Sequence, residues 1–104
     1  MSNEPVMAAA LLTNAVGLHA RPSVKLTQLA KSFVSSVDIA LDAAGPWIDA
    51  KSPVKVMRVK ASKGATLHVR ADGPDAAAAV SAVIALIERR FDEHEPAAAG
   101  VVHG

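Results

Sequence analysis

Apolar and polar positions along the chain follow the periods of strands and helices, and together they predict a small mixed domain. An apolar run from Val6 to Thr13 is typical of a buried strand. Between Pro22 and Phe33, apolar residues recur every three or four positions, which predicts an amphipathic helix. Pro22 suits the first turn of this helix, because a backbone N–H there would have no intrahelical partner. The first strand therefore leads through a turn at Gly17 to the beginning of a helix.

The middle of the chain predicts a hairpin followed by a short helix. Val37, Ile39 and Leu41 occupy alternate positions, so we expect them on one face of a strand. Ser52 followed by Pro53 is typical of a helix start, with a serine N-cap and a proline in the first turn. The elements expected here are a strand over 36–41, a turn over 42–46, a short strand over 47–49 and a helix from 53 to about 59.

The last third of the chain predicts one more strand and one more helix. Leu67 and Val69 face one way in a strand over 66–71, and the polar residues between them face solvent. The final helix follows Asp75, and its apolar stripe extends to Phe91. The order β-α-β-β-α-β-α implies an α+β fold, in which helices cover one face of an antiparallel four-stranded sheet as an open-faced sandwich.

Length and composition fit one domain with an aliphatic core. The chain of 104 residues can build a single core, which we place in a domain over 1–93. Hydrophobic periodicity is lost over 94–104, so we expect a disordered tail there. Hydrophobic residues make up 51% of the chain but aromatic residues only 3%, so aliphatic side chains must fill the core. The absence of cysteine excludes disulfides and thiol catalysis.

Charge and targeting patterns limit the classes of partner. The formal net charge of +1 gives no strong attraction to nucleic acid or to an anionic membrane. The sequence shows neither a secretory leader pattern nor an apolar run of membrane-spanning length, so we expect a cytoplasmic protein. His68, His94 and His103 form no metal-binding pattern, and we expect neither a metal nor a bound cofactor.

The segment Gly17 to Pro22 carries the candidate chemistry. It places His19 and Arg21 immediately before the expected first turn of a helix. Unpaired N–H groups and the helix dipole attract an anion at such a position, and a neutral imidazole can attack phosphorus. The guanidinium of Arg21 adds a fixed cation that can hydrogen-bond phosphoryl oxygens. The residues expected to form the phosphate-stabilising helix start are Ala20, Pro22 and Ser23.

The hexapeptide Gly-Leu-His-Ala-Arg-Pro before an amphipathic helix resembles the HPr family, the histidine-containing phosphocarrier proteins of the bacterial phosphotransferase system (PTS). The pairs Lys51-Ser52 and Val56-Met57 resemble the family's second functional segment, and the likeness extends over about 6–91. The resemblance implies that His19 accepts a phosphoryl group from phosphorylated Enzyme I and passes it to IIA-type acceptor proteins. It also implies a monomeric carrier rather than a free-standing enzyme.

The second segment resembles the family's regulatory and docking region, with one departure. Ser52 is a helix N-cap and corresponds to the serine that HPr kinase/phosphorylase modifies in some bacteria. Pro-Val-Lys over 53–55 stands where the family has an aliphatic residue, a methionine and a glycine. Apolar residues of this region dock the family's partners, so we expect Leu18, Val54 and Met57 to keep a reduced docking patch.

Several functions within and beyond the family remain open at this point. Lys55 and Arg58 add positive charge near the docking patch, which suits an acidic partner surface. The carrier could serve sugar uptake, a nitrogen-related branch, or the phosphotransfer subunit of dihydroxyacetone kinase. The alternative from a different class is a regulatory HPr paralogue that acts by phosphorylation-dependent protein binding.

Overall fold

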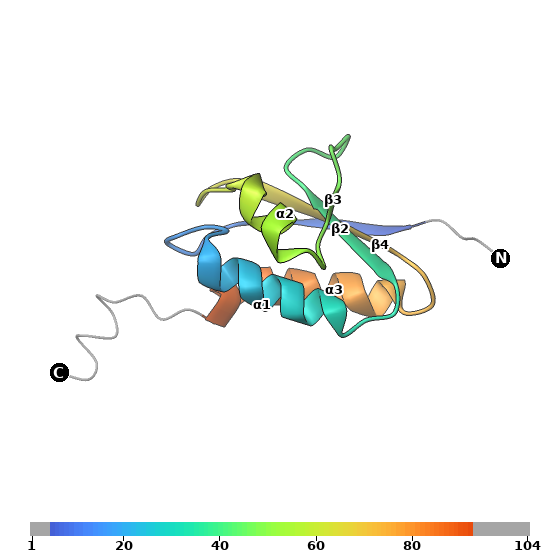
Figure 1. The fold of residues 1–104 in the computed structure, drawn as a ribbon. Helices are drawn as coiled ribbons and strands as arrows, with labels where there is room; N and C mark the ends of the chain where they lie inside the picture. Colours follow the sequence, from blue (N-terminus) through green and yellow to red (C-terminus); the bar gives the residue numbers. More distant parts are fainter. Residues whose placement is uncertain (1–4, 93–104) are drawn as a thin grey trace.

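A computed structural model describes residues 5–92, and its elements follow the predicted order β-α-β-β-α-β-α (Figure 1). In chain order they are β1 (Val6–Leu11), α1 (Ala20–Lys31), β2 (Ser36–Ala40), β3 (Ile48–Asp49), α2 (Pro53–Val59), β4 (Thr66–Asp72), α3 (Ala76–Glu88) and the 3-10 turn η1 (Arg90–Asp92). The tail expected over 94–104 lies outside the described residues. Within residues 5–92, no helix combines the length and apolar composition needed to cross a membrane.

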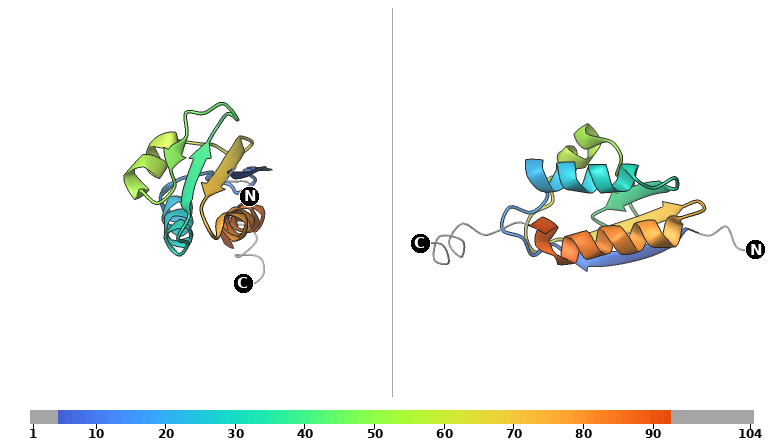
Figure 2. Two further views of the ribbon diagram at one scale, coloured as in Figure 1. Left: turned by 90° about the vertical axis from the view of Figure 1, so that its right-hand side faces the viewer. Right: turned by 90° about the horizontal axis from the view of Figure 1, so that it is seen from below.

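The strands form one antiparallel sheet in the order β1-β4-β2-β3, which confirms the predicted α+β class. The register places Val69 of β4 between Ala8 of β1 and Ile39 of β2, so one face of the sheet is aliphatic. On this face α3 packs against β1 and β4, and α1 lies beside α3 (Figures 1 and 2). The shorter α2 packs against α1 and β3.

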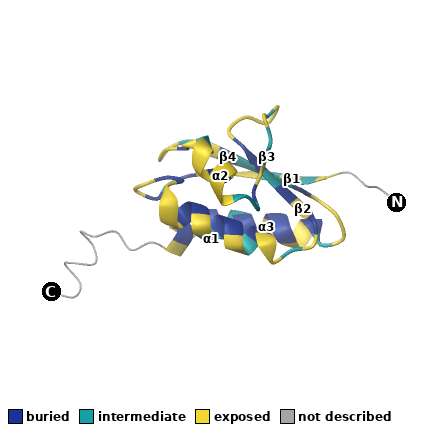
Figure 3. Cartoon of the chain, in the orientation of Figure 1, coloured by how far each residue is buried: buried dark blue, intermediate teal, exposed yellow. Residues whose placement is uncertain are grey.

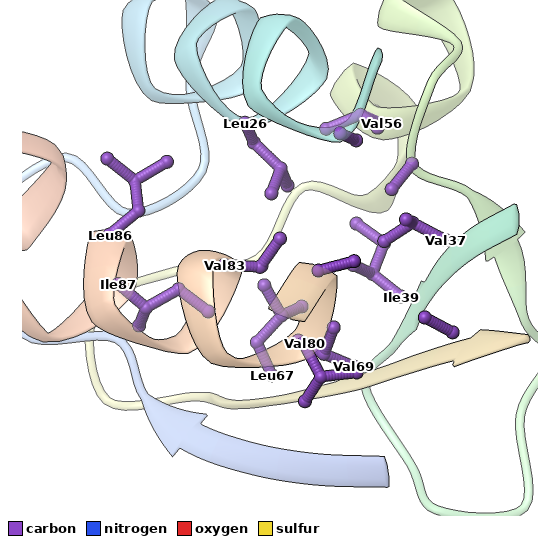
Figure 4. Close-up of a cluster of buried hydrophobic side chains, with 14 of the residues drawn as sticks. Leu26, Val37, Ile39, Val56, Leu67, Val69, Val80, Val83, Leu86 and Ile87 are labelled. Atoms are coloured by element: carbon purple, nitrogen blue, oxygen red, sulfur yellow. The ribbon is translucent and has the colours of Figure 1, made fainter. Parts of the chain in front are cut away.

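The core lies between the aliphatic face of the sheet and the helices. Leu26 of α1, Val56 of α2 and Val83 of α3 are fully buried and converge with Val37 of β2 (Figure 4). Burial of each such aliphatic side chain stabilises the fold by about 2 kcal/mol. Phe91 is the one aromatic residue among those described that is fully buried, so the prediction of an aliphatic core is confirmed.

The strand β2 ends one residue earlier than expected. It stops at Ala40, and Leu41 is 47% exposed, so the expectation that Leu41 shares a strand face with Val37 and Ile39 is wrong. Asp42 begins a tight turn at this point. The N–H of Gly45 donates to the Asp42 carbonyl and the N–H of Ala44 donates to the Asp42 carboxylate, both at 2.8 Å. This turn directs the chain away from the sheet.

The final helix is also shorter than its apolar stripe. It ends at Glu88, and Phe91 reaches the core from η1 with a φ of 57° rather than from a continuous helix. The ammonium of Lys25 on α1 donates to the Phe91 carbonyl at 2.5 Å. A contact between elements that are distant in sequence therefore fixes the position of Phe91, and helical periodicity could not reveal it.

The expected strand over 47–49 begins at Ile48, and Trp47 precedes it as a packing residue. The guanidinium of Arg70 on β4 lies 4.3 Å from the centroid of the Trp47 ring. The same guanidinium donates to the Asp38 carboxylate at 3.2 Å. A cation–π contact and an ion pair thus attach the β2–β3 hairpin to β4 on the open face of the sheet.

Candidate functional site

His19 lies at the exact start of α1, as the N-cap residue. Its backbone is extended, with φ −90° and ψ −163°, and its exposed imidazole makes no capping hydrogen bond. The helix begins at Ala20, so the expectation that Arg21 precedes the first turn is wrong, and Arg21 is the second helical residue. Pro22 is the third helical residue. A backbone N–H at this position would have no carbonyl acceptor within the helix, so proline is tolerated there.

The first turn of α1 presents two backbone N–H groups beside His19. Those of Ala20 and Arg21 have no carbonyl partner within the helix, and Pro22 has no N–H. Ser23 cannot contribute as expected, because it is fully buried and its N–H donates to the His19 carbonyl at 2.9 Å. Its hydroxyl donates to the Leu18 carbonyl at 3.2 Å. Ser23 therefore stabilises the helix start from the buried side, and Ala20 and Arg21 carry the N–H groups that can bind an anion.

The loop before His19 requires glycine. Gly17 has a φ of +62°, and a Cβ on this residue would lie 2.5 Å from the Ala61 carbonyl oxygen. The N–H of Leu18 donates to that same oxygen at 2.9 Å. The side chain of Asn14 donates to the Gly17 carbonyl at 2.7 Å. Asn14 was not predicted as a site residue, because an asparagine before a glycine turn is compatible with many loops.

The helix α2 supplies part of the proposed docking patch. Ser52 is its N-cap, and the Ser52 hydroxyl accepts the N–H of Lys55 at 3.4 Å, which confirms the predicted cap. Most of α2 is exposed (Figure 3). On this helix Val54 and Met57 are 59% and 46% exposed. Leu18 is only 2% exposed, because it packs into the core beneath the loop. The expectation that its side chain belongs to an exposed patch is therefore wrong.

Charge is distributed unevenly along the chain. The segments 5–37 and 50–71, which build the site, contain nine of the eleven Lys and Arg residues and none of the ten Asp and Glu residues. Lys55 and Arg58 are exposed on α2, and Arg21 is exposed on the neighbouring α1. The helices α1 and α2 thus carry exposed cations and no acidic residue, although the net charge of the chain is only +1. Counting charge by segment would have revealed this from the sequence.

The site has the parts needed to hold a phosphoryl group but not those of a metal centre. In the part of the chain that the structure describes, no three His, Cys, Asp or Glu side chains gather closely enough to bind a metal ion. An exposed imidazole, a guanidinium and two N–H groups at a helix N-terminus are instead suited to a tetrahedral oxyanion.

Comparisons with known proteins place this geometry in a family context. The sequence profile described as PTS HPr component phosphorylation site matches residues 7–89. Phosphocarrier protein HPr of Cupriavidus necator is 48% identical over 84 residues, which are 81% of this chain and 92% of that protein. Phosphocarrier protein NPr of Escherichia coli K12 is 38% identical over 82 residues, which are 79% of this chain and 90% of that protein.

Solved structures agree with the sequence comparisons. HPr-C-His from Thermoanaerobacter tengcongensis superposes with a TM-score of 0.78 at 30% identity, and the match covers 86% of this chain and 99% of that chain. HPr from Bacillus anthracis superposes with a TM-score of 0.72 at 28% identity, and this match covers 80% and 96%. The predicted fold and family resemblance are therefore both confirmed.

Proposed function

Because the chain belongs to the HPr family of phosphocarrier proteins of the bacterial phosphotransferase system, we propose that His19 is the residue that carries the phosphoryl group. A member of this family is a phosphoryl carrier rather than an enzyme. An imidazole nitrogen of His19 attacks phosphorus on phosphorylated Enzyme I, and a new N–P bond forms. The bond between phosphorus and the donor breaks, and its electron pair leaves with the donor group.

The observation that carries this proposal is the position of His19 at the N-cap of α1. An imidazole there projects from the helix end whose N–H groups and dipole favour negative charge. The N–H groups of Ala20 and Arg21 can donate to the phosphoryl oxygens, and the Arg21 guanidinium can reach them from the first turn. The two N–H groups belong to the first turn of a formed helix, so we expect transfer to require little rearrangement of the carrier backbone.

The family implies PTS partners such as Enzyme I and IIA-type proteins. We expect both to dock on the surface formed by Val54 and Met57, with Lys55 and Arg58 at its edge. The apolar side chains provide area that several partners can share, and the cations favour acidic partner surfaces. We expect the protein to act in the cytoplasm as a monomer, where both kinds of partner can reach one copy of the site in turn.

Ser52 is a second candidate for phosphorylation. It is half-buried at the start of α2, and its hydroxyl makes only a long hydrogen bond of 3.4 Å as a cap. A phosphate at this helix start would be tolerated electrostatically, so HPr kinase/phosphorylase would block docking on α2 rather than unfold the protein. Incubation with the purified kinase and ATP, with Ser52→Ala as the control, tests this directly by mass.

Two branches of the PTS are supported by particular relatives. The relatives include proteins named phosphocarrier protein HPr and phosphocarrier protein NPr, so a sugar-uptake branch and a nitrogen-related branch are both kept as candidates. A phosphocarrier that supplies transport exchanges its phosphoryl group rapidly with a IIA-type acceptor. A regulator holds the phosphoryl group and changes the affinity of a partner instead. Rapid-quench measurement of transfer to sugar-type and nitrogen-type IIA proteins discriminates the two.

The experiment that tests the proposal is intact-mass analysis after incubation with Enzyme I and phosphoenolpyruvate. We expect one acid-labile phosphoryl adduct on the wild-type protein and none on His19→Gln. His68→Gln is the matched control, because His68 lies partly exposed on β4, on the opposite face of the sheet from the helices. An adduct that survives in His19→Gln, or that is lost in His68→Gln, would refute the assignment.

A further inference from the structure

We propose that Asn14 is a positioning residue for phosphoryl transfer at His19, a role that rests on the proposed function of His19. Asn14 lies in the loop between β1 and α1 and is only 1% exposed. Its side-chain Nδ2 donates to the Gly17 carbonyl at 2.7 Å, and its own carbonyl accepts the Gly17 N–H at 3.2 Å. The side chain and the main chain of Asn14 therefore close the same four-residue turn.

This contact fixes one particular peptide plane. The carbonyl of Gly17 and the N–H of Leu18 belong to a single planar unit. Asn14 holds the oxygen of that unit, and the Ala61 carbonyl accepts its N–H at 2.9 Å. The plane is held at both edges, so it cannot rotate about the chain direction without breaking a hydrogen bond.

The same plane sets the position of His19. The next two carbonyls, of Leu18 and His19, both accept hydrogen bonds from Ser23, through its hydroxyl at 3.2 Å and its N–H at 2.9 Å. The backbone on the helical side of His19 is therefore held by α1, and the backbone on the loop side is held through Gly17. The imidazole makes no capping bond of its own. Its direction relative to the first-turn N–H groups thus depends on this framework.

A buried amide is a costly way to fill space, because it must be hydrogen-bonded to be stable. An apolar residue of similar volume could fill the same space under the loop. Asn14 instead supplies a donor aimed at one carbonyl, two residues before the proposed reactive side chain. Displacement of a reacting group by about 1 Å can slow a reaction roughly 100-fold. Loss of this donor should therefore affect transfer more than it affects the binding of Enzyme I.

The test compares three substitutions at Asn14. Asn14→Asp and Asn14→Leu both remove the N–H donor, one with a charge and one without. Asn14→Ser is shorter but keeps a hydroxyl donor. Val83→Ala is the control for general destabilisation, because it removes buried packing from α3. The two readouts are kcat and KM for transfer from phosphorylated Enzyme I, and the half-life of the phosphohistidine in the isolated protein.

We expect kcat to fall 10- to 100-fold in Asn14→Asp and Asn14→Leu, with KM changed less than threefold. Asn14→Ser should recover part of the lost kcat. The phosphohistidine half-life should differ from wild type in the two donor-free variants. The proposal is overturned if the folded donor-free variants keep kcat within twofold of wild type. It is also overturned if Val83→Ala shows the same loss, or if neither donor-free variant folds, because Asn14 would then be structural only. Failure of wild type to be phosphorylated at His19 would instead refute the proposed function.

Discussion

At the scale of single residues, we expect the proposed phosphoryl transfer at His19 to depend on backbone N–H groups as well as on side chains. Ala20→Pro tests this, because proline is tolerated at the first helical position and removes one N–H without ending the helix. The extended backbone of His19 is compatible with a following proline. Hydrogen bonds to a charged group contribute roughly 1.5–3 kcal/mol, so we expect transfer to slow about 10-fold or more. Rapid-quench measurement of the rate of transfer from phosphorylated Enzyme I tests this expectation.

Ala20→Ser is the control, since it keeps the N–H and alters only the side chain. Equal rates for Ala20→Pro and Ala20→Ser, with unchanged helix content by circular dichroism, would contradict a role for this N–H group.

The side chain of Arg21 provides a second test at the same scale. It is exposed in the first turn of α1, and its planar fork can donate two hydrogen bonds to phosphoryl oxygens. We expect kcat for phosphoryl transfer to fall about 10-fold in Arg21→Ala and less in Arg21→Lys, which keeps the charge but not the fork. Gln28→Ala, also exposed on α1, should transfer at the wild-type rate. An equally slow Gln28→Ala would show that the helix surface, not the guanidinium, matters.

His19 and Arg21 could be proposed as site residues from the sequence because both belong to one short contiguous motif. The supporting residues could not be assigned in the same way. Ser23 is adjacent in sequence, yet its polar groups face the loop, and Leu18 is adjacent yet buried. The side chain of Asn14 donates to the Gly17 carbonyl, and the orientation of that carbonyl depends on the hydrogen bond between the Leu18 N–H and the distant Ala61 carbonyl.

At the scale of elements, one carboxylate ties the start of α3 to the end of the loop after α1. Asp75 accepts the N–H groups of Val34 and Ser35 at 3.0 and 2.8 Å, and its own N–H donates to the Ser35 hydroxyl at 3.0 Å. The hydrogen bond with Ser35 and those from the two N–H groups lower the pKa of Asp75 from 3.8 to about 2. This link was not predicted, because its partners are separated by 40 residues.

A lowered pKa means that the ionised carboxylate favours the folded state. Its contribution is fully present above about pH 4 and is lost as the pH falls from 3.8 toward 2. We expect Asp75→Asn to be less stable than wild type at pH 7 and to lose less stability than wild type between pH 4 and 2. Urea unfolding across this pH range measures both effects. Asp72→Asn, a neighbouring exposed carboxylate, should leave the profile unchanged.

Thr27 on α1 offers a test of the core at the same scale. It is 2% exposed, and within the described residues its hydroxyl has no hydrogen-bond partner. A buried hydroxyl without a partner costs free energy that a methyl group does not. We expect Thr27→Val to raise the free energy of unfolding by up to about 1 kcal/mol and to leave phosphoryl transfer unchanged. Leu26→Ala at the adjacent buried position should instead lower it by about 3 kcal/mol. Urea unfolding measures both variants, and a lower free energy of unfolding for Thr27→Val than for wild type would contradict the cost assigned to the Thr27 hydroxyl.

Element types could be predicted because the periods of apolar residues differ between helices and strands, but several element ends could not. β2 ends where the Asp42 turn begins, and α3 ends three residues before the last member of its apolar stripe. In both places a hydrogen bond or a tertiary contact overrides a periodic pattern.

At the scale of the whole molecule, the charges are separated in a way that the net charge conceals. The segments that build the site hold nine cations and no anions, and the acidic residues lie elsewhere along the chain. Such a distribution directs the positive face toward an acidic surface and accelerates encounter without adding buried contacts. The docking of several partners on one small face is therefore expected to depend strongly on ionic strength.

Charge reversal on α2 tests this dependence. The double variant Lys55→Glu, Arg58→Glu replaces two exposed cations beside the docking patch. We expect KM for Enzyme I to rise about 10-fold at low salt with kcat nearly unchanged, because steering acts on encounter rather than on chemistry. The difference from wild type should shrink at 0.5 M salt, where charges are screened within about 4 Å. Lys31→Glu reverses an exposed cation at the other end of α1 and should change KM little. If Lys31→Glu raised KM as much as the double variant, overall charge rather than the face around His19 would govern docking.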